Sequence, residues 1–177
     1  MTITKSITID CQGVLGGVLV SAGNGISVNV PTGSFVQLKG LDIDGLNNSS
    51  AGVAMLNSGF LAIENCTIYG FTYGVYVNGL AGARVTVDDT KIRKNTNGVY
   101  ILPQGGVSNG VNINRTIVDA STTANLTVSP GTTVRLSDSS LTGSPVAVSS
   151  TGGTVDSYGN NRIDHLGTVT LTALALQ

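Results

Sequence analysis

Short runs of alternating apolar and polar residues recur at a nearly constant spacing along this chain. In each run, an apolar-x-apolar pair is usually followed by Asn, Asp or Gly two residues later and by another apolar residue five positions after the pair. Alternation with a period of two is typical of β-strands, and Asn, Asp and Gly are typical of turns. The copies that agree position by position are Val36-x-Leu38 with Gly40 and Ile43, Leu61-x-Ile63 with Asn65 and Ile68, and Val85-x-Val87 with Asp89 and Ile92.

The second residue of each apolar pair serves as an anchor that measures the repeat. Successive anchors lie 25, 24, 26, 23 and 22 residues apart, in the series Leu38, Ile63, Val87, Ile113, Leu136 and Tyr158. An earlier pair, Ile7-x-Ile9, begins the series. A fixed period of this length indicates stacked structural repeats, and we predict seven turns.

A further alternating segment occurs in most repeats. The copies are Gly25-Ile26-Ser27-Val28, Gly52-Val53-Ala54-Met55, Gly74-Val75-Tyr76-Val77, Gly98-Val99-Tyr100-Ile101, Asn125-Leu126-Thr127-Val128 and Pro145-Val146-Ala147-Val148. One coil alone cannot bury its apolar face, so neighbouring coils must stack at about 4.8 Å with parallel strands. We predict an all-β parallel solenoid with three short strands per coil, in one domain over 1–177 whose coils span 3–163 and whose 164–177 segment forms a strand or cap.

Composition narrows the class of protein. The chain has 177 residues, 11% of them charged, and a net charge of −1. This balance argues against an electrostatic nucleic-acid binder. The sequence contains no apolar run long enough for a membrane span, and its first residues do not have the pattern of a signal peptide.

The run Leu61 to Ile68 followed by Gly74-Val75-Tyr76-Val77 resembles the right-handed parallel β-helix family that includes pectate lyases and polygalacturonases. The resemblance covers about residues 3–163 and picks out no single enzyme. It implies a right-handed coil and an extracellular or cell-surface location. It also implies a stacked ladder of turn residues, which Asn65, Asp89, Asp138 and Asn160 resemble and from which Gly40 and Arg115 depart.

By the same resemblance, the Gly-Val-Tyr-Val strands correspond to the sheet that carries the substrate cleft in the enzymes. We expect its outward positions to be Ser27, Ala54, Tyr76, Tyr100, Thr127 and Ala147, with Tyr73 and Asn97 just before two of the strands. Polygalacturonases carry a catalytic acid in an Asn-Thr-Asp-Gly segment, but here that position is Asn97, whose amide cannot transfer a proton. We nominate Tyr73, Tyr76, Asn97 and Tyr100 for ligand binding. The alternative is that Tyr76 and Tyr100, stacked about 5 Å apart, only stiffen the sheet.

Most of the charge is expected on another outer face, one residue after each anchor, at Asp10, Lys39, Glu64 and Asp88, followed by Asn114 and Ser137. Glu64 beside Asp88 would be a like-charge pair, which raises one carboxyl pKa and can separate acid from base roles. Lys39, Glu64 and Asp88 are therefore the candidate catalytic residues. The alternative is an exposed ladder of ion pairs.

Three other groups of side chains bear on ligands. Lys91, Arg93 and Lys94, with Arg84 earlier in the coil, form a basic patch that can hold an anionic polymer or be neutralised by Asp44 and Asp119. Cys11 and Cys66 lie in different coils, so we expect free thiols. His165 has no Cys or His neighbours at metal-ligand spacing, and we expect neither a metal nor another cofactor.

Our preferred interpretation is a non-catalytic scaffold or binding protein, with polysaccharide as the expected partner. The alternative is a carbohydrate-active enzyme, a polysaccharide lyase or glycoside hydrolase, that uses Lys39, Glu64 and Asp88. Met1 leads almost directly into the strand at Ile7, without a cap, so that either the chain is truncated or another subunit covers this end. Exposed coil edges lead us to expect self-association.

Overall fold

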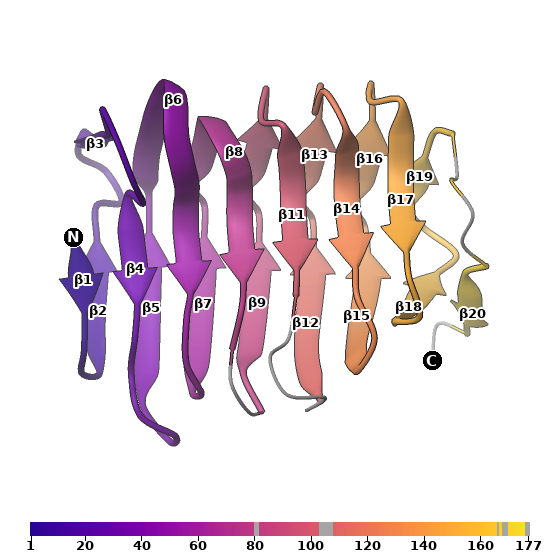
Figure 1. The fold of residues 1–177 in the computed structure, drawn as a ribbon, viewed down its shortest axis with the longest axis horizontal. Coiled ribbons are helices and arrows are strands. Elements are labelled where there is room, and N and C mark those ends of the chain that lie inside the picture. The colour runs from indigo at the N-terminus through magenta and orange to yellow at the C-terminus, as the bar shows by residue number, and fades with distance from the viewer. Residues whose placement is uncertain (80–81, 103–107, 166, 168–169, 176–177) are drawn as a thin grey trace.

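The computed structural model describes residues 1–79, 82–102, 108–165, 167 and 170–175, and these residues form strands and turns without a helix. The chain winds into a parallel β-solenoid of about six turns (Figure 1). The sequence predicted seven. The last predicted repeat supplies β18 (Thr154–Tyr158) and β19 (Arg162–Ile163), but the described residues that follow contain no strand on the third face.

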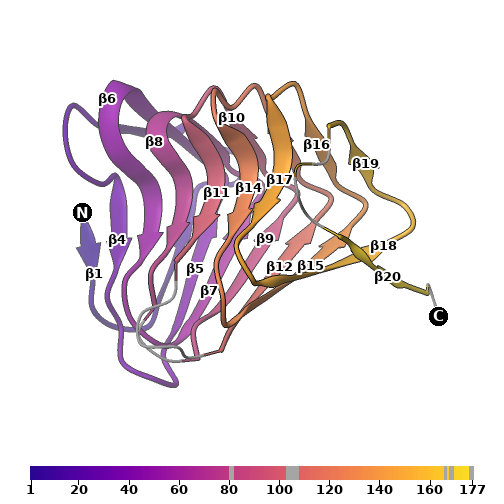
Figure 2. The same ribbon diagram turned by 45° about the vertical axis from the view of Figure 1, so that its right-hand side comes forward.

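The strands form three faces that enclose one interior (Figure 2). Face one is an eight-stranded sheet, and faces two and three together form a twelve-stranded sheet. All strand pairs are parallel, as the stacking of successive coils requires. Face one contains β2 (Ile7–Asp10), β5 (Phe35–Lys39), β7 (Phe60–Glu64), β9 (Arg84–Asp88), β12 (Asn109–Asn114), β15 (Thr132–Ser137), β18 and β20 (Thr172–Leu174).

Two long strands, β6 (Leu41–Met55) and β8 (Thr67–Val77), turn the corner and belong to both other faces. Their first halves lie on face two with β3 (Gly16–Leu19), β10 (Lys91–Arg93), β13 (Ile117–Asp119), β16 (Ser140–Thr142) and β19. Their second halves lie on face three with β1 (Thr2–Ile3), β4 (Ile26–Val28), β11 (Asn97–Ile101), β14 (Ala124–Val128) and β17 (Val146–Ser150).

The predicted anchors form a continuous apolar column inside face one. Leu38 lies opposite Ile63, and Ile63 lies opposite Val87, with all three side chains fully buried. The column continues through Ile113 to Leu136. The last anchor was wrong by one position, because Leu136 lies opposite Ser157, while the half-buried Tyr158 pairs with Leu174 of β20.

The corner between faces one and two repeats a left-handed backbone residue. Positive φ angles occur at Gly40 (64°), Asn65 (51°), Asp89 (47°), Arg115 (44°) and Asp138 (49°). Thus the two departures from the Asn pattern, Gly40 and Arg115, share the conformation of the others. Asn and Asp adopt this conformation at lower cost than most residues, which explains their recurrence here.

Buried hydroxyl groups satisfy the backbone just inside this corner. The amide N–H of Thr90 donates to Thr116 Oγ1 at 3.4 Å, and that of Thr116 donates to Ser139 Oγ at 3.2 Å. The ladder begins with Cys66 N–H donating to Thr90 Oγ1 and ends with Ser139 N–H donating to Asn161 Oδ1. Each rung supplies an acceptor where the corner would otherwise bury a bare N–H group.

Small residues form a column on the inner side of face three, where the neighbouring strand leaves no room for a side chain. A Cβ added at Gly74 would lie 2.6 Å from the carbonyl oxygen of Gly98, and one at Gly52 would lie 2.7 Å from that of Gly74. Ala147 continues this inner column and is 1% exposed. It was predicted to face outward, but Thr127 pairs with Ser149, so Ser149 takes the outer position. The reason is a local shift of the Pro145 segment that the sequence pattern did not reveal.

Candidate functional site

Three tyrosines form an aromatic cluster on the outer side of face three. Tyr73 and Tyr76 come from β8 and Tyr100 from β11, where Tyr100 lies directly opposite Tyr76. Gly74 lies between the first two and faces the interior, so that Tyr73 and Tyr76 reach the same outer surface although they are three residues apart. The three tyrosines therefore lie on one face, as the sequence predicted.

The rings pack in a different way from the expected stack of Tyr76 on Tyr100. Those two ring centroids are 6.0 Å apart with the planes tilted by 45°. Tyr73 lies closer to both, at 5.0 Å from Tyr76 in a stacked arrangement and 4.9 Å from Tyr100. Burial raises the pKa of Tyr76, with smaller contributions from the neighbouring phenols of Tyr73 and Tyr100. The Tyr76 hydroxyl therefore remains neutral near pH 7.

Asn97 lies at the edge of this cluster. It pairs in register with Tyr73 on one side and with Ala124 on the other, and only 9% of its surface is exposed. Around the rings, the outer positions of face three hold small side chains. They are Ser27, Ala54, Thr127 and Ser149.

The charged column on face one has the predicted register. Asp10 pairs with Lys39, Lys39 with Glu64 and Glu64 with Asp88, and Asn114 and Ser137 follow. Lys39 Nζ lies 3.1 Å from Glu64 Oε2, and Gln37 Nε2 donates a hydrogen bond to Glu64 Oε1 at 2.7 Å.

The expected rise of a carboxyl pKa in this column does not occur at Glu64. The hydrogen bond from Gln37 is the largest influence, and together with Lys39 it outweighs partial burial and holds the pKa of Glu64 below its ordinary value. Asp88 is neutralised by Arg115, whose guanidinium contacts its Oδ2. The three candidate catalytic residues thus belong to two ion pairs that lie side by side.

The sequence did not predict that Arg115 contacts this column. Arg115 occupies the left-handed corner after β12 and reaches back one coil to Asp88 on β9. The one sequence signal for this contact was that Arg115 replaces the Asn or Asp usual at this corner. A long cationic side chain at an exposed corner can reach the neighbouring coil.

The predicted basic patch is divided between two faces. Arg84 belongs to β9 on face one, whereas Lys91 and Arg93 belong to β10 on face two. Asp119 does pair in register with Arg93, but Tyr69 separates Arg93 from Asp44. Asp44 therefore lies two coils away from Arg93 and neutralises its charge less than the sequence predicted.

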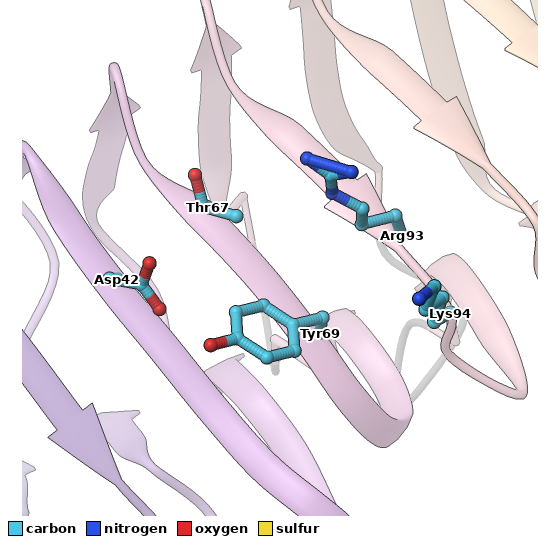
Figure 3. A pocket seen from close by; sticks show the side chains of 5 residues that line it. All are labelled: Asp42, Thr67, Tyr69, Arg93 and Lys94. Atoms are coloured by element: carbon cyan, nitrogen blue, oxygen red, sulfur yellow. The ribbon is translucent and has the colours of Figure 1, made fainter.

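A shallow depression of 280 Å³ lies beside this patch on face two, lined by Asp42, Thr67, Tyr69, Arg93 and Lys94 (Figure 3). A second hollow of 310 Å³ continues from it and shares Asp42 and Tyr69. Sequence reasoning did not single out Asp42, Thr67 or Tyr69. Their outward positions beside Ile43 and Ile68 follow from the repeat, but nothing in the pattern shows that they border a hollow.

A larger hollow of 440 Å³ lies on face one, but many of its polar side chains bind one another. Ser137 donates to Asn114 Oδ1 at 2.6 Å, and Asn160 donates to Asp138 Oδ1 at 2.8 Å.

Both cysteines are free, with Cys66 buried. Burial raises the pKa of the Cys66 thiol, which keeps it protonated. In the described part of the chain, no three His, Cys, Asp or Glu side chains gather as they would around a metal ion. Nor do these residues form a helix long and apolar enough to cross a membrane.

The family comparison agrees with the architecture. A family model described as a right handed beta helix region matches residues 2–163 of the chain. No curated protein and no solved structure matches it. Because the match covers nearly the whole chain and the strands form a parallel solenoid over the same residues, the protein belongs to the right-handed β-helix family.

Proposed function

We propose that this protein is a non-catalytic β-helix scaffold that binds carbohydrate chains through the tyrosine cluster of face three. The observation that carries the proposal is the group of three mutually packed rings, Tyr73, Tyr76 and Tyr100, on a sheet face whose other outer positions are small. Phenol rings offer apolar surface with a hydroxyl at the edge. A sugar unit has the matching surface, apolar C–H groups on a ring with hydroxyls around it.

The chemistry of the cluster favours binding over cleavage. Glycoside hydrolysis usually needs two carboxyl groups, one of them with a raised pKa. The outer positions of face three that pair with or flank the rings carry no carboxylate. On face one, the pKa of Glu64 is lowered and Asp88 is held by Arg115, which argues against the alternative of an enzyme using Lys39, Glu64 and Asp88.

A binding screen with matched variants tests this proposal. Affinity electrophoresis in gels that contain neutral or acidic polysaccharides compares the wild type with Tyr76→Ala and Tyr100→Ala. The control is Tyr158→Ala, which removes a half-buried tyrosine on face one. We expect retardation by at least one polysaccharide, weakened about tenfold by each face-three variant and unchanged in the control. Equal retardation of all four proteins would contradict the proposed site.

Product analysis separates binding from catalysis. The same polysaccharides are incubated with the wild type and with Glu64→Gln, and new reducing or unsaturated ends are measured. We expect none. Turnover by the wild type that is lost in Glu64→Gln would establish the enzyme alternative. We also propose the extracellular or cell-surface location that goes with such a ligand.

A further inference from the structure

We propose that the depression on face two is a second, separate site, which binds an acidic sugar unit by its anionic group and its hydroxyls. The site is lined by Asp42, Thr67, Tyr69, Arg93 and Lys94 and has a volume of 280 Å³. It lies on a different face from the tyrosine cluster, so it does not depend on the function proposed for that cluster.

The cationic side of the depression forms no ion pair with the described residues, although Asp119 lies in register opposite Arg93 on the next strand. Among the described residues the ion pairs are Lys39–Glu64, Arg115–Asp88 and Arg135–Asp156, so neither Arg93 nor Lys94 takes part in one. Both side chains are exposed and border the same hollow. A guanidinium with free donors beside an ammonium group is suited to a carboxylate or sulfate.

The opposite side of the depression carries an acceptor. Asp42 stands across from Arg93 and Lys94, with the ring of Tyr69 between them (Figure 3). The Asp42 carboxylate interacts with the Tyr69 hydroxyl and is the main cause that raises the pKa of Tyr69, so the phenol stays protonated beside the carboxylate. A carboxylate has more acceptor positions than one phenol fills, and the rest can take hydroxyl groups.

This arrangement selects among anionic ligands. Asp42 and Asp44 border the continuing hollow beyond Tyr69, so a ligand with closely spaced negative charges, such as a nucleic acid, would be repelled there. A sugar ring with one anionic group and several hydroxyls fits both sides, with the anion at Arg93 and Lys94 and hydroxyls at Asp42 and Thr67. The larger hollow on face one is less suitable because many of its polar groups are already hydrogen-bonded to one another.

Isothermal titration with a matched pair of probes tests the site. The probes are a short neutral oligosaccharide that carries one hexuronate unit and the same oligosaccharide with that carboxyl group reduced to a neutral alcohol. We expect the wild type to bind the acidic probe, with an affinity that falls as salt rises. We expect Arg93→Gln and Lys94→Gln to weaken binding about tenfold each. The control is Lys91→Gln, which removes the same charge from the same coil outside the depression and should change affinity less than about twofold.

Further arms identify the site and the group that it binds. The titrations are repeated in a Tyr76→Ala background, in which the proposed site on face three is weakened. Binding at face two is then measured apart from the tyrosine cluster, so that failure of either site is distinguishable. A sulfated oligosaccharide that binds in place of the hexuronate one would identify the anion as sulfate and retain the site. Three results would overturn the proposal. They are equal binding of the acidic and reduced probes in the Tyr76→Ala background, an unchanged affinity in Arg93→Gln with the fold intact by circular dichroism, and displacement of the probe by inorganic sulfate at the probe's own concentration.

Discussion

Lys39 Nζ lies 3.1 Å from Glu64 Oε2 across the neighbouring strands β5 and β7 of face one. Two residues that are 25 positions apart in the sequence thus meet because one coil separates them. Gln37, on the same strand as Lys39, donates a second bond to the Glu64 carboxylate. The geometry stabilises the charged form of Glu64, which is the opposite of what a general acid requires.

We predict that this stabilisation depends on pH. The pKa of Glu64 is lowered in the folded protein, so its contribution is present at neutral pH and is lost as the pH falls through the folded-state value. At neutral pH the free energy of unfolding of the wild type should exceed that of Glu64→Gln by about 0.5–1 kcal/mol. This difference should be lost at an acid pH below the folded-state pKa of Glu64. Urea denaturation of both proteins at the two pH values measures it.

Glu64 is the single glutamate of the chain, so its titration can be followed directly by NMR of its side-chain carboxyl carbon. Lys39→Met and Gln37→Leu should each raise its pKa toward the ordinary value. A midpoint above that value in the wild type would contradict the assignment.

We predict that the buried hydroxyl ladder contributes measurably to stability. Thr116→Val removes the oxygen that accepts from the N–H of Thr90 and leaves that donor buried without a partner. The expected loss is about 1–3 kcal/mol in free energy of unfolding. Thr86→Val, on the outer side of face one, is the control and should change stability by less than about 0.5 kcal/mol. Equal effects of the two changes would argue against the ladder.

We predict that the inner column of face three tolerates no side chain at Gly74. Its added Cβ would lie 2.5 Å from Ile92 Cγ2 and 2.6 Å from the carbonyl oxygen of Gly98, and that backbone atom cannot move independently of the sheet. Gly74→Ala should cost about 3 kcal/mol in thermal or chemical unfolding. Gly17→Ala meets nothing within 4 Å and should be neutral or slightly stabilising. Similar midpoints for both variants would show that the strands can separate locally.

We also predict self-association through the coil edge formed by β1, β2 and β3. Near this edge Leu15 is fully exposed, and 71% of the surface of Leu19 is accessible. Exposed apolar side chains beside strand edges favour contact with another molecule, and we propose a second copy of the chain. Light scattering should show a mass that rises with concentration, and Leu15→Asp with Leu19→Asp should suppress the rise. A monodisperse monomer at high concentration would refute the prediction.

The repeat made most of the fold predictable. Alternation placed Leu38, Ile63 and Val87 in one buried column, and the turn residues marked the corner where Asn65 and Asp89 have positive φ. The same alternation predicted which charged residues lie opposite one another on the outer side of face one. The prediction failed near the C-terminal end, at Ala147 and Tyr158, where the strands pair one or two residues out of the predicted register. Such a shift keeps the alternation of apolar and polar residues but moves each side chain to another column.

The sequence alone therefore determined the parallel coil, its period and the faces on which most candidate residues lie, since these follow from local alternation and a fixed repeat length. The tertiary structure decided which side chains meet. It turned Tyr73 toward both neighbouring rings and brought Arg115 back to Asp88. It also placed Asp42, Tyr69 and Arg93 around one depression. Long side chains on stacked coils can reach several neighbours at similar distances, and only packing and charge in three dimensions select among those contacts.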